Sequence, residues 1–550
     1  MRSRLVGCCA VLWWACLGPQ VHAQGWDEEP ADEAPIVDPE LAGEPGAQPA
    51  PAGPAASAAS TASAAPSTPD APAMSSAPMP APSTGEVHTM IRSRTGMDLY
   101  RFDPRQDIVT STQLLSIEAT VRPKEGTRLV VGLRPVHRFM TRADATSDAR
   151  AARFELDVLP GPAYADLTLA DGVHLRLGYQ YLHLGRFDLL SATNVLSASD
   201  LRDGPMTFPE AAELSQPAAR VDWDPNLWLS LRFVYVPFFQ PHVVSLGDGD
   251  YALFPSTQAQ VDANLDASLG NGANSFRRQL LVSTSRAGQE AIAQSGFEAF
   301  SPVADLSRPQ AAVRATAHGP AGEAGATVAL ANERLPAPAF SRAMRTYLDD
   351  PTVANEMAVG GSSQAPVEVL YNRFALASVD GATHVGPVQV GAELAYMFGR
   401  TFFAAAEGRV AVPQRSDLAQ AGLRLEYLRG EHLAVAAEAF VAYALHEPEG
   451  DGRQWLMLDG GRFLTGLGGL ASWSPADLGL LFELGGGALS GPSYAVLPRV
   501  EYTIIAGLAA ELGAALLFGP EPPETAGPEF SLAGRYADAD QVFVGLRYLP

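Results

Sequence analysis

The chain has 550 residues, of which 38 are basic and 61 acidic, and its formal net charge is −23. This acidic balance excludes nucleic acid as a partner, because binding to phosphates needs a basic surface. All three cysteines lie at positions 8, 9 and 16, so the chain beyond them forms no disulfide and no cysteine metal site.

Residues 1–23 are predicted to be a cleaved export signal. Arg2 and Arg4 supply a charged start, an uncharged apolar stretch follows, and the small residues Val21 and Ala23 suit cleavage after Ala23. The apolar stretch is too short to span a bilayer as a helix. A lipoprotein signal at Cys8 is the alternative, but too few residues precede it to hold an apolar core. Export without a helical anchor leads to the periplasm or the outer membrane of a Gram-negative cell.

Residues 24–96 are predicted to form a disordered periplasmic linker. Its acids cluster between Asp27 and Glu33, and residues 47–84 are almost entirely Ala, Pro, Ser and Thr. Such a composition has too little apolar surface to offset the entropy lost on ordering. We interpret the segment as a solvated spacer; the alternative is an arm that recruits envelope partners.

Residues 97–550 alternate between apolar and polar side chains in short runs joined by turns. Within 173–181, apolar residues occupy the odd positions, and His174, Arg176, Gly178 and Gln180 occupy the even ones. A period of two indicates a strand with one apolar and one polar face. Many such strands behind an export signal predict an all-β fold, a transmembrane antiparallel β-barrel of about 16 strands, with about 14 to 18 compatible.

Turn signals divide this region into strands. The predicted strands are 112–121, 128–139, 153–159, 163–170, 173–184, 219–223, 227–236, 311–318, 326–332 and 541–548. Other turns are predicted at Pro160-Gly161-Pro162, Asp171-Gly172, Asp380-Gly381, Arg429-Gly430 and Pro475-Ala476-Asp477. Long insertions are predicted at 185–216, 240–310, 335–367, 400–417 and 446–462. Short turns alternating with long loops are typical of outer-membrane barrels.

No catalytic, cofactor or metal site is predicted, and the chain is not expected to be an enzyme. It contains no HExxH, GxxxxGK or GxSxG motif. The acid pairs Asp248/Asp250 and Asp538/Asp540 lack the rest of a calcium-ligating set, so we interpret them as solvated turn acids. An outer-membrane hydrolase is the alternative from another class, but it would need a Ser/His or Asp/His set that cannot be assembled from the motifs.

Polar residues on the inward faces of the predicted strands are the candidate functional residues. A barrel of about 16 strands cannot fill its interior with strand side chains, so it holds water, a plug or a binding cavity. Arginines and carboxylates on such a wall set the field that acts on passing ions. The lumen-facing candidates are His174, Arg176, Gln180, Arg220, Asp222, Arg232, Arg424 and Glu426.

Residues 161–241 resemble a known family. The matching segments are 163–167 (AYADL), 175–180 (LRLGYQ), Asp188, 194–196 (NVL), 200–202 (DLR), 217–223 (PAARVDW) and 236–241 (VPFFQP). They are similar to a proteobacterial outer-membrane β-barrel family of uncharacterised function, itself distantly similar to alginate-export-type porins. The chain departs from the pattern at Tyr179, where Arg is usual, and at Val195-Leu196, which replace Asn-Pro. The resemblance implies an outer-membrane location and passage of a bulky or apolar solute, and it supplies no catalytic residues.

These observations predict a passive outer-membrane channel or facilitator for a small or apolar solute. A structural barrel that recruits envelope partners through its N-terminal arm is the alternative. The expected partners are outer-membrane lipid, the barrel-assembly machinery and a small solute. By analogy with porins of similar strand number, a homo-oligomer is also expected.

Overall fold

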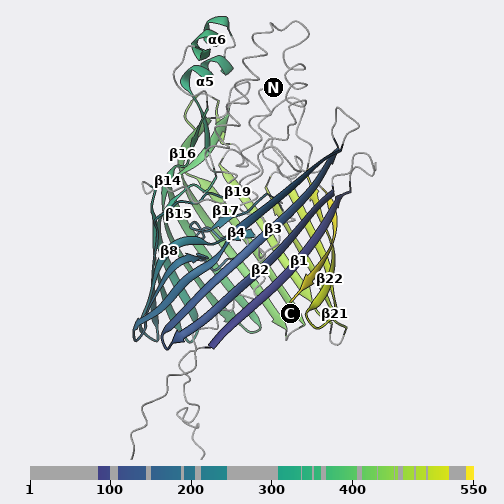
Figure 1. The fold of residues 1–550 in the computed structure, drawn as a ribbon. Coiled ribbons are helices and arrows are strands. Elements are labelled where there is room, and N and C mark those ends of the chain that lie inside the picture. Colours follow the sequence, from purple (N-terminus) through teal and green to yellow (C-terminus); the bar gives the residue numbers. More distant parts are fainter. Residues whose placement is uncertain are drawn as a thin grey trace, which may run out of the picture. The chain divides into compact units, whose positions relative to one another are not determined.

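The computed structural model describes residues 84–99, 109–143, 150–187, 191–202, 204, 212–243, 308–335, 337–349, 352–360, 367–405, 412–429, 432–450, 452–455, 462–475, 478–490, 493–519 and 540–549. Eighteen antiparallel strands in them close into a barrel (Figure 1). The predicted all-β barrel is therefore confirmed, at the upper end of the predicted strand number. The predicted export signal and nearly all of the predicted linker lie outside the described residues.

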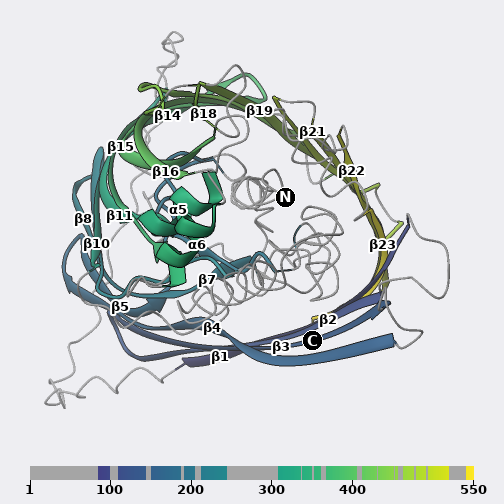
Figure 2. The ribbon, with the colours of Figure 1, turned by 90° about the horizontal axis from the view of Figure 1, so that it is seen from above.

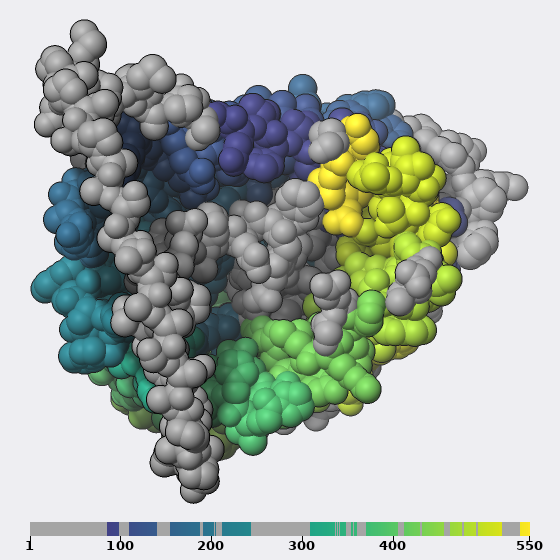
Figure 3. Space-filling model, turned by 90° about the horizontal axis from the view of Figure 1, so that it is seen from below, coloured from purple at the N-terminus to yellow at the C-terminus, as the bar shows by residue number. Residues whose placement is uncertain are grey.

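The barrel closes between its first and last strands. β1 (Thr84–Asp98) pairs antiparallel with both β2 (Val109–Lys124) and β23 (Gln541–Tyr548). Figure 3, seen from below, shows the purple first strand and the yellow last strand side by side. The other barrel strands, in pairing order, are β3 (Thr127–Ala143), β4 (Arg150–Ala170), β5 (Val173–Gln180), β8 (Gln216–Asn226), β9 (Leu229–Val236), β10 (Gln310–Gly319), β11 (Gly322–Asn332), β14 (Arg373–Val385), β15 (Val388–Ala405), β16 (Val412–Arg429), β17 (Leu433–Ala444), β19 (Phe463–Trp473), β20 (Leu480–Leu489), β21 (Ser493–Ile505) and β22 (Leu508–Phe518).

Barrel strands present an apolar face outward and a buried face inward. On β22 and β23, Leu512, Val544 and Leu546 are each more than half exposed, whereas Glu511 and Phe543, which alternate with them, are buried. An exposed apolar outer surface is what a lipid bilayer requires, because lipid cannot hydrate polar groups. The alternation that predicted the final strand, residues 541–548, thus has its apolar side on the outside of the barrel.

The two ends of the barrel differ. Tight turns such as Glu125-Gly126 and Asp171-Gly172 lie at one end, and the connections 181–215, 237–309, 333–372 and 445–462 leave from the other. The third of these carries two short helices, which lie above the barrel in Figure 1. No helix in the described ranges is long and apolar enough to cross a membrane. The short elements outside the barrel sheet are β6 (Ala198–Ser199), β7 (Glu213–Leu214), β12 (Ala337–Phe340), α5 (Arg342–Asp349), α6 (Val353–Gly360) and β13 (Val367–Leu370). The short strand β18 (Gln454–Trp455) pairs with the end of β15.

The barrel begins earlier than the sequence predicts. Strand β1 starts at Thr84, so the predicted boundary at Met97 is wrong and the linker prediction overlaps a barrel strand. The outward face of β1 mixes the apolar Val87, Ile91 and Met97 with polar residues such as Ser93 and Thr95, so its apolar alternation is incomplete.

The predicted turn at Pro160-Gly161-Pro162 is wrong, because β4 runs through it as one strand. Its pairing register with β3 shifts between Val131 and Leu133. A Cβ atom on Gly161 would lie 2.6 Å from the carbonyl oxygen of Gly132, so the two glycines let the bulged backbones approach closely. Turn residues in a β-barrel can therefore mark a bulge instead of a chain reversal.

The predicted turn at Asp380-Gly381 is also wrong. Asp380 lies in the middle of β14, where its side chain is buried and binds arginines of the barrel interior. The chain reverses instead at Gly386, whose φ of +62° suits a turn glycine. Asp-Gly does not mark a hairpin here, because the aspartate pairs with arginines inside the barrel.

Two further boundaries differ from the sequence prediction. The connection between β15 and β16 covers only residues 406–411, not 400–417, because a bulge between Met397 and Arg400 interrupts the alternation within β15. The strand predicted at 173–184 ends at Gln180, and the residues after it turn into the barrel interior.

Candidate functional site

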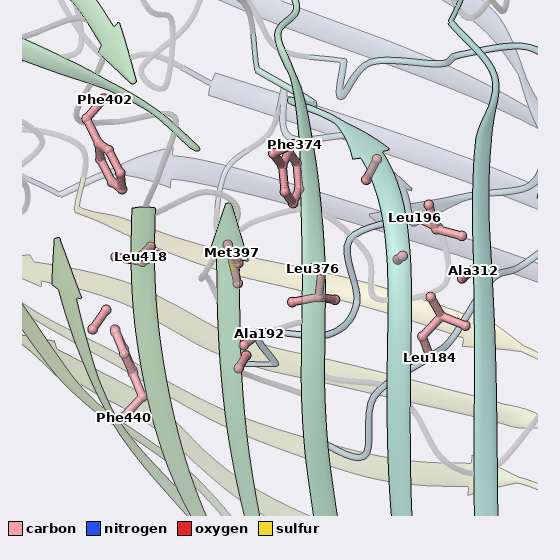
Figure 4. Close-up of a cluster of buried hydrophobic side chains, with 14 of the residues drawn as sticks. Leu184, Ala192, Leu196, Ala312, Phe374, Leu376, Met397, Phe402, Leu418 and Phe440 are labelled. Atoms are coloured by element: carbon pink, nitrogen blue, oxygen red, sulfur yellow. The ribbon is translucent and has the colours of Figure 1, made fainter. Parts of the chain in front are cut away.

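The connection between β5 and β8 lies against the inner surface of the barrel. Figure 2, seen from above, shows β7, near the end of this connection, inside the ring of strands. Its side chains Leu182, Leu184, Ala192 and Leu196 are buried in one apolar cluster with inward residues of the barrel strands (Figure 4). We call β10, β11 and β14–β17, which supply most of those residues, the covered wall. Its inward residues in the cluster include Ala312, Ala329, Phe374, Leu376, Met397, Leu418 and Phe440.

Ion pairs fix the later part of the same connection to β3 and β4. The carboxylate of Asp200 is fully buried and accepts hydrogen bonds from Arg138 at 2.7 Å and from Arg202 at 3.0 Å. Arg202 also donates to Asp157 of β4 at 2.7 Å. Burial alone would raise the pKa of Asp200, but Arg202 and Arg138 outweigh it and lower that pKa from 3.8 to about 2. The connection is therefore fastened to the barrel at two separate places.

Arg334 joins this connection to two others. Its guanidinium donates to the carbonyl oxygens of Leu196 and Gln240, and to the side-chain oxygen of Gln216 at 2.9 Å. The backbone N–H of His242 donates to the Arg334 carbonyl at 3.0 Å, and the His242 Nδ1 accepts from Ser199. Burial, together with Arg334 and Arg400, lowers the pKa of His242 from 6.5 to about 3, so the imidazole is neutral.

Charged side chains occupy the inward positions nearer the short-turn end, and we call this set the charged belt. On β4, β5, β8 and β9, Arg176 binds Asp166 at 2.8 Å, and Arg220 and Arg232 both bind Asp222, at 2.6 and 2.7 Å. The Arg232 side chain remains 34% exposed, the most of these five. This arc therefore carries three arginines to two carboxylates, and part of it is open to solvent.

The belt continues across the covered wall. Arg314 of β10 binds Asp380 of β14 through two hydrogen bonds of 2.7 and 2.8 Å. Arg186, from the connection after β5, reaches the same carboxylate at 2.8 Å. Glu393 of β15 stands directly opposite Asp380 in the strand register and accepts a hydrogen bond from Thr193 at 3.2 Å. Two residues of the connection thus bind the belt.

On β16 and β17 the belt is richer in carboxylates. Arg424 binds Glu426 on its own strand and Glu438 on the neighbouring strand, each at 3.0 Å. Its guanidinium also donates to the backbone carbonyl of Arg186 at 3.4 Å. One arginine here serves two carboxylates and the inward connection.

The belt is completed where the barrel closes, at β21, β22, β23 and β1, which we call the seam. The carboxylate of Glu511 on β22 is 1% exposed and binds Arg92 at 2.9 Å and Arg94 at 3.0 Å, both on β1. These contacts cross β23 at Gly545, where any Cβ atom would collide with the Glu511 side chain. Arg499 of β21 binds Glu483 at 2.5 Å and approaches Glu511 at 3.5 Å. A shared buried carboxylate therefore ties the first strand to the last hairpin.

The eight sequence candidates occupy three different settings. Arg176, Arg220, Asp222, Arg232, Arg424 and Glu426 all belong to the ion pairs of the charged belt. His174 bonds to Thr168 at 3.3 Å near the short-turn end, in an exposed position. Gln180 is 1% exposed and donates to the carbonyl of Ala218 at 3.0 Å, so it is packed into the wall.

Other members of the belt were missed from the sequence. Asp380 was hidden by the turn signal that it forms with Gly381, and Glu511 interrupts an otherwise apolar run. Arg92 and Arg94 lie before the predicted start of the barrel. Their alternation, an arginine at every second position, is the one local signal that could have identified an inward face.

No group of three or more metal-ligating side chains occurs among the residues that the structure describes. The acid pair Asp248/Asp250 lies outside those residues. Of the second pair only Asp540 is described, and its carboxylate accepts a hydrogen bond from the backbone N–H of Leu517 at 2.6 Å.

The structure is similar in architecture to solved outer-membrane porins. OmpF of Salmonella typhi, in a complex with daunomycin, is 8% identical with a TM-score of 0.35, and the alignment covers 85% of this chain and 97% of that chain. OccAB3 of Acinetobacter baumannii is 10% identical with a TM-score of 0.41, covering 85% and 99%. OpdK of Pseudomonas aeruginosa, solved with vanillate, is 11% identical with a TM-score of 0.39, covering 84% and 98%. No family model and no curated protein matches the chain.

Proposed function

We propose that this protein is a passive channel for small polar solutes in the outer membrane of a Gram-negative bacterium. The observation that carries the proposal is the charged belt, which places ion-paired arginines and carboxylates on inward faces around a closed barrel. Barrels of about 16 to 18 strands leave an aqueous channel, and a polar interior is typical of porins.

The distribution of charge supports a selective role for the lumen. Within the charged belt, three arginines meet two carboxylates on β4, β5, β8 and β9, whereas one arginine meets two carboxylates on β16 and β17. Groups of opposite sign on different parts of the wall create a field across the lumen, which orients solutes that carry separated charges. Because both signs are present, we expect only a weak overall preference between cations and anions.

The packing on the covered wall indicates that the path for solutes through the lumen is narrow. The connection after β5 occupies part of the interior with buried apolar side chains, and solute must pass beside it. A path lined by charged residues favours polar solutes over the apolar ones that the sequence left open.

The more detailed expectations belong to this proposal. Kinship with alginate-export-type barrels rests on the sequence resemblance of residues 161–241, which hold the end of β4, then β5, β8, β9 and the fastened connection with its Asp200–Arg202 cluster. We also propose that residues 1–23 are a cleaved signal and that the outer-membrane barrel machinery assembles the chain. The barrel would then contact outer-membrane lipid and form a homo-oligomer.

Single-channel recording of the refolded chain without residues 1–23 tests the proposal. We expect stable current steps in planar bilayers and a small reversal potential in asymmetric salt. Arg232→Glu should shift the reversal potential toward cation preference, whereas Arg462→Glu, at an exposed pair with Glu447 outside the belt, should not. Insertion into the bilayer without current would contradict the channel.

A further inference from the structure

Five of the nine histidines in residues 24–550 lie at the short-turn end of the barrel, the lower end in Figure 1. His88 lies in the first third of β1, and His174 is the second residue of β5. His318 and His384 each precede the last residue of a strand, β10 and β14, and His432 directly precedes β17. We call these five residues the mouth histidines.

The mouth histidines belong to the inward faces of their strands. Side chains alternate along a strand, so residues an even number of positions apart share a face. The strand registers are unbroken over the stretches concerned. Each mouth histidine is an even number of positions from an inward residue of the charged belt: His88 from Arg92, His174 from Arg176, His318 from Arg314, His384 from Asp380 and His432 from Glu438.

Carboxylates surround His88. Its Nε2 atom lies 3.9 Å from Glu86 of its own strand, and Glu118 stands opposite it on β2. On the other side, β23 pairs with β1 only from Ile91 onward. The His88 side chain is 61% exposed, so water and ions reach it.

One carboxylate lies between two other mouth histidines. Glu323 belongs to β11, the strand between β10 and β14, and it lies 3.4 Å from Nδ1 of His318. On β9, the other neighbour of β10, Ser230 bonds to Nε2 of His318 at 3.2 Å. His384 stands opposite the uncharged Gln389 on β15. The two imidazoles thus have Glu323 as their nearby counter-charge.

The remaining two histidines have different neighbours. His174 stands opposite Asp222 on β8 and opposite the uncharged Thr168 on β4. Nδ1 of His432 lies 3.1 Å from a backbone carbonyl oxygen next to β19, and Arg429 of β16 pairs with the residue that follows it. His432 therefore has a cationic neighbour, whereas His174 has an anionic one.

Histidine is the side chain whose charge ordinarily changes between about pH 5 and 8. Acidification over this range adds positive charge at five places around one end of the lumen. A protonated imidazole first neutralises a carboxylate beside it, and the rest of the added charge is exposed to passing ions. The charges of the arginines at this end do not change in the same range.

We propose that the mouth histidines set the ion preference of the barrel according to pH. As the pH falls from about 8 to about 5.5, this end of the lumen becomes more positive, and anionic solutes enter it more readily. The effect on passage rests on the proposed channel function, whereas the change of potential at the mouth does not.

The first test measures the potential at the mouth without any current. Gln389→Cys places a thiol opposite His384, and residues 24–550 contain no other cysteine. Negatively and positively charged methanethiosulfonate reagents react with the same thiolate, so the ratio of their rates cancels the titration of the thiol. We expect the negative-to-positive ratio to rise about threefold between pH 8 and pH 5.5. Thr346→Cys, on α5 above the barrel, is the control position and should show no rise.

Variants then assign the change to the histidines. His446→Gln, in the connection at the opposite end of the barrel, should leave the rise intact. Heat-dependent mobility on gels confirms that each variant forms a barrel. The variant that should abolish the rise combines His88→Gln, His174→Gln, His318→Gln, His384→Gln and His432→Gln.

The second test is the reversal potential of single channels in a KCl gradient. Low salt is needed, because charges are screened beyond about 10 Å at 0.1 M. Acidification should shift the reversal potential of the wild type toward anion preference, and the five-histidine variant should not respond. Each channel should respond to acid in one compartment only, since the mouth histidines lie at one end.

Each outcome decides one part. A labelling ratio that stays constant in the wild type, or rises equally in the five-histidine variant, would overturn the role of the mouth histidines. A rise in the ratio without a shift in reversal potential would overturn their control of ion preference. A wild-type barrel that carries no current would remove the channel proposal, while the labelling ratio would still decide whether the histidines charge the mouth.

Discussion

The covered wall and the seam use the same inward positions in opposite ways. On the covered wall, Phe374, Leu376 and Met397 face inward beneath the connection after β5 and form part of an apolar cluster. At the seam, Arg92, Arg94 and Glu511 face inward and satisfy one another across three strands. Inward residues are apolar where apolar side chains of the connection pack on them, and they are charged where arginines and carboxylates can pair, as at the seam and where Arg186 binds Asp380.

The two regions also differ in how a substitution lowers their stability. An apolar cluster loses stability in proportion to the atoms removed and the cavity left behind. A buried ion pair fails abruptly, because loss of one partner leaves the other charge buried and uncompensated. The seam is therefore the more sensitive region, and it closes the barrel.

The largest effect is expected from Glu511→Gln, which leaves Arg92 and Arg94 without their shared carboxylate. Breaking a buried ion pair costs about 3–5 kcal/mol, and we expect a matching loss in the free energy of unfolding, measured by urea titration in detergent. Glu447→Gln, at an exposed pair with Arg462, is the control and should cost less than about 1 kcal/mol. Equal losses in the two variants would show that the seam has no special role in closure.

On the covered wall, Leu376→Ala should lower the free energy of unfolding by about 2–5 kcal/mol, through lost burial and the cavity that remains. Leu376 is 1% exposed within the cluster that includes the inward connection. Hydrogen exchange should also rise at residues 182–196. A loss of stability without faster exchange there would mean that the cluster stabilises the wall but not the connection.

The outer faces of the two regions should behave alike. Leu512 at the seam and Val379 on the covered wall are 54% and 53% exposed and point away from the interior. Replacing either with Arg puts a charge toward lipid, at a cost of about 2–4 kcal/mol near the midplane. Folding into vesicles, followed by gel mobility, measures both. A clear difference would mean that one of these faces is not in contact with lipid.

The smallest effect at neutral pH concerns His242, which lies where three connections meet. Its folded pKa of about 3 is below its unfolded value of 6.5, so its stabilising contribution is complete above pH 6.5 and is lost as the pH falls toward 3. Each pH unit in that range removes no more than about 1.4 kcal/mol. We expect faster hydrogen exchange at residues 194–202 at pH 5 than at pH 7, after correction for intrinsic rates. His242→Gln should reduce this pH dependence, and an unchanged dependence would exclude His242 as its source.

The sequence predicts the fold class well because alternation is a local property. The final strand, residues 541–548, is predicted with its observed bounds, since its inward and outward residues differ clearly in polarity. The alternation is incomplete in β1, whose outward face mixes apolar and polar residues. Asp380-Gly381 resembles a turn in sequence, although Asp380 lies inside β14 and binds two arginines.

The candidate site is less predictable because its partners are distant in sequence. Strand periodicity alone predicts inward positions for Arg176, Arg220, Asp222 and Arg232, but it cannot pair Glu511 with Arg92, because that contact depends on how the barrel closes. The Phe187 ring likewise packs beside Gly391 and Gly422, which belong to strands far along the chain. Such contacts follow from the number of strands and their register, which single-strand patterns do not encode.

Chemical modification of Arg232→Cys during single-channel recording tests the central claim most directly, because this partly exposed belt position should line the conducting path. We predict that a negatively charged methanethiosulfonate reagent changes the current in one irreversible step, and that Leu512→Cys, on the outer face, does not respond. An unmodified current through Arg232→Cys, with labelling of the cysteine confirmed by mass spectrometry, would contradict a solute path along the charged belt.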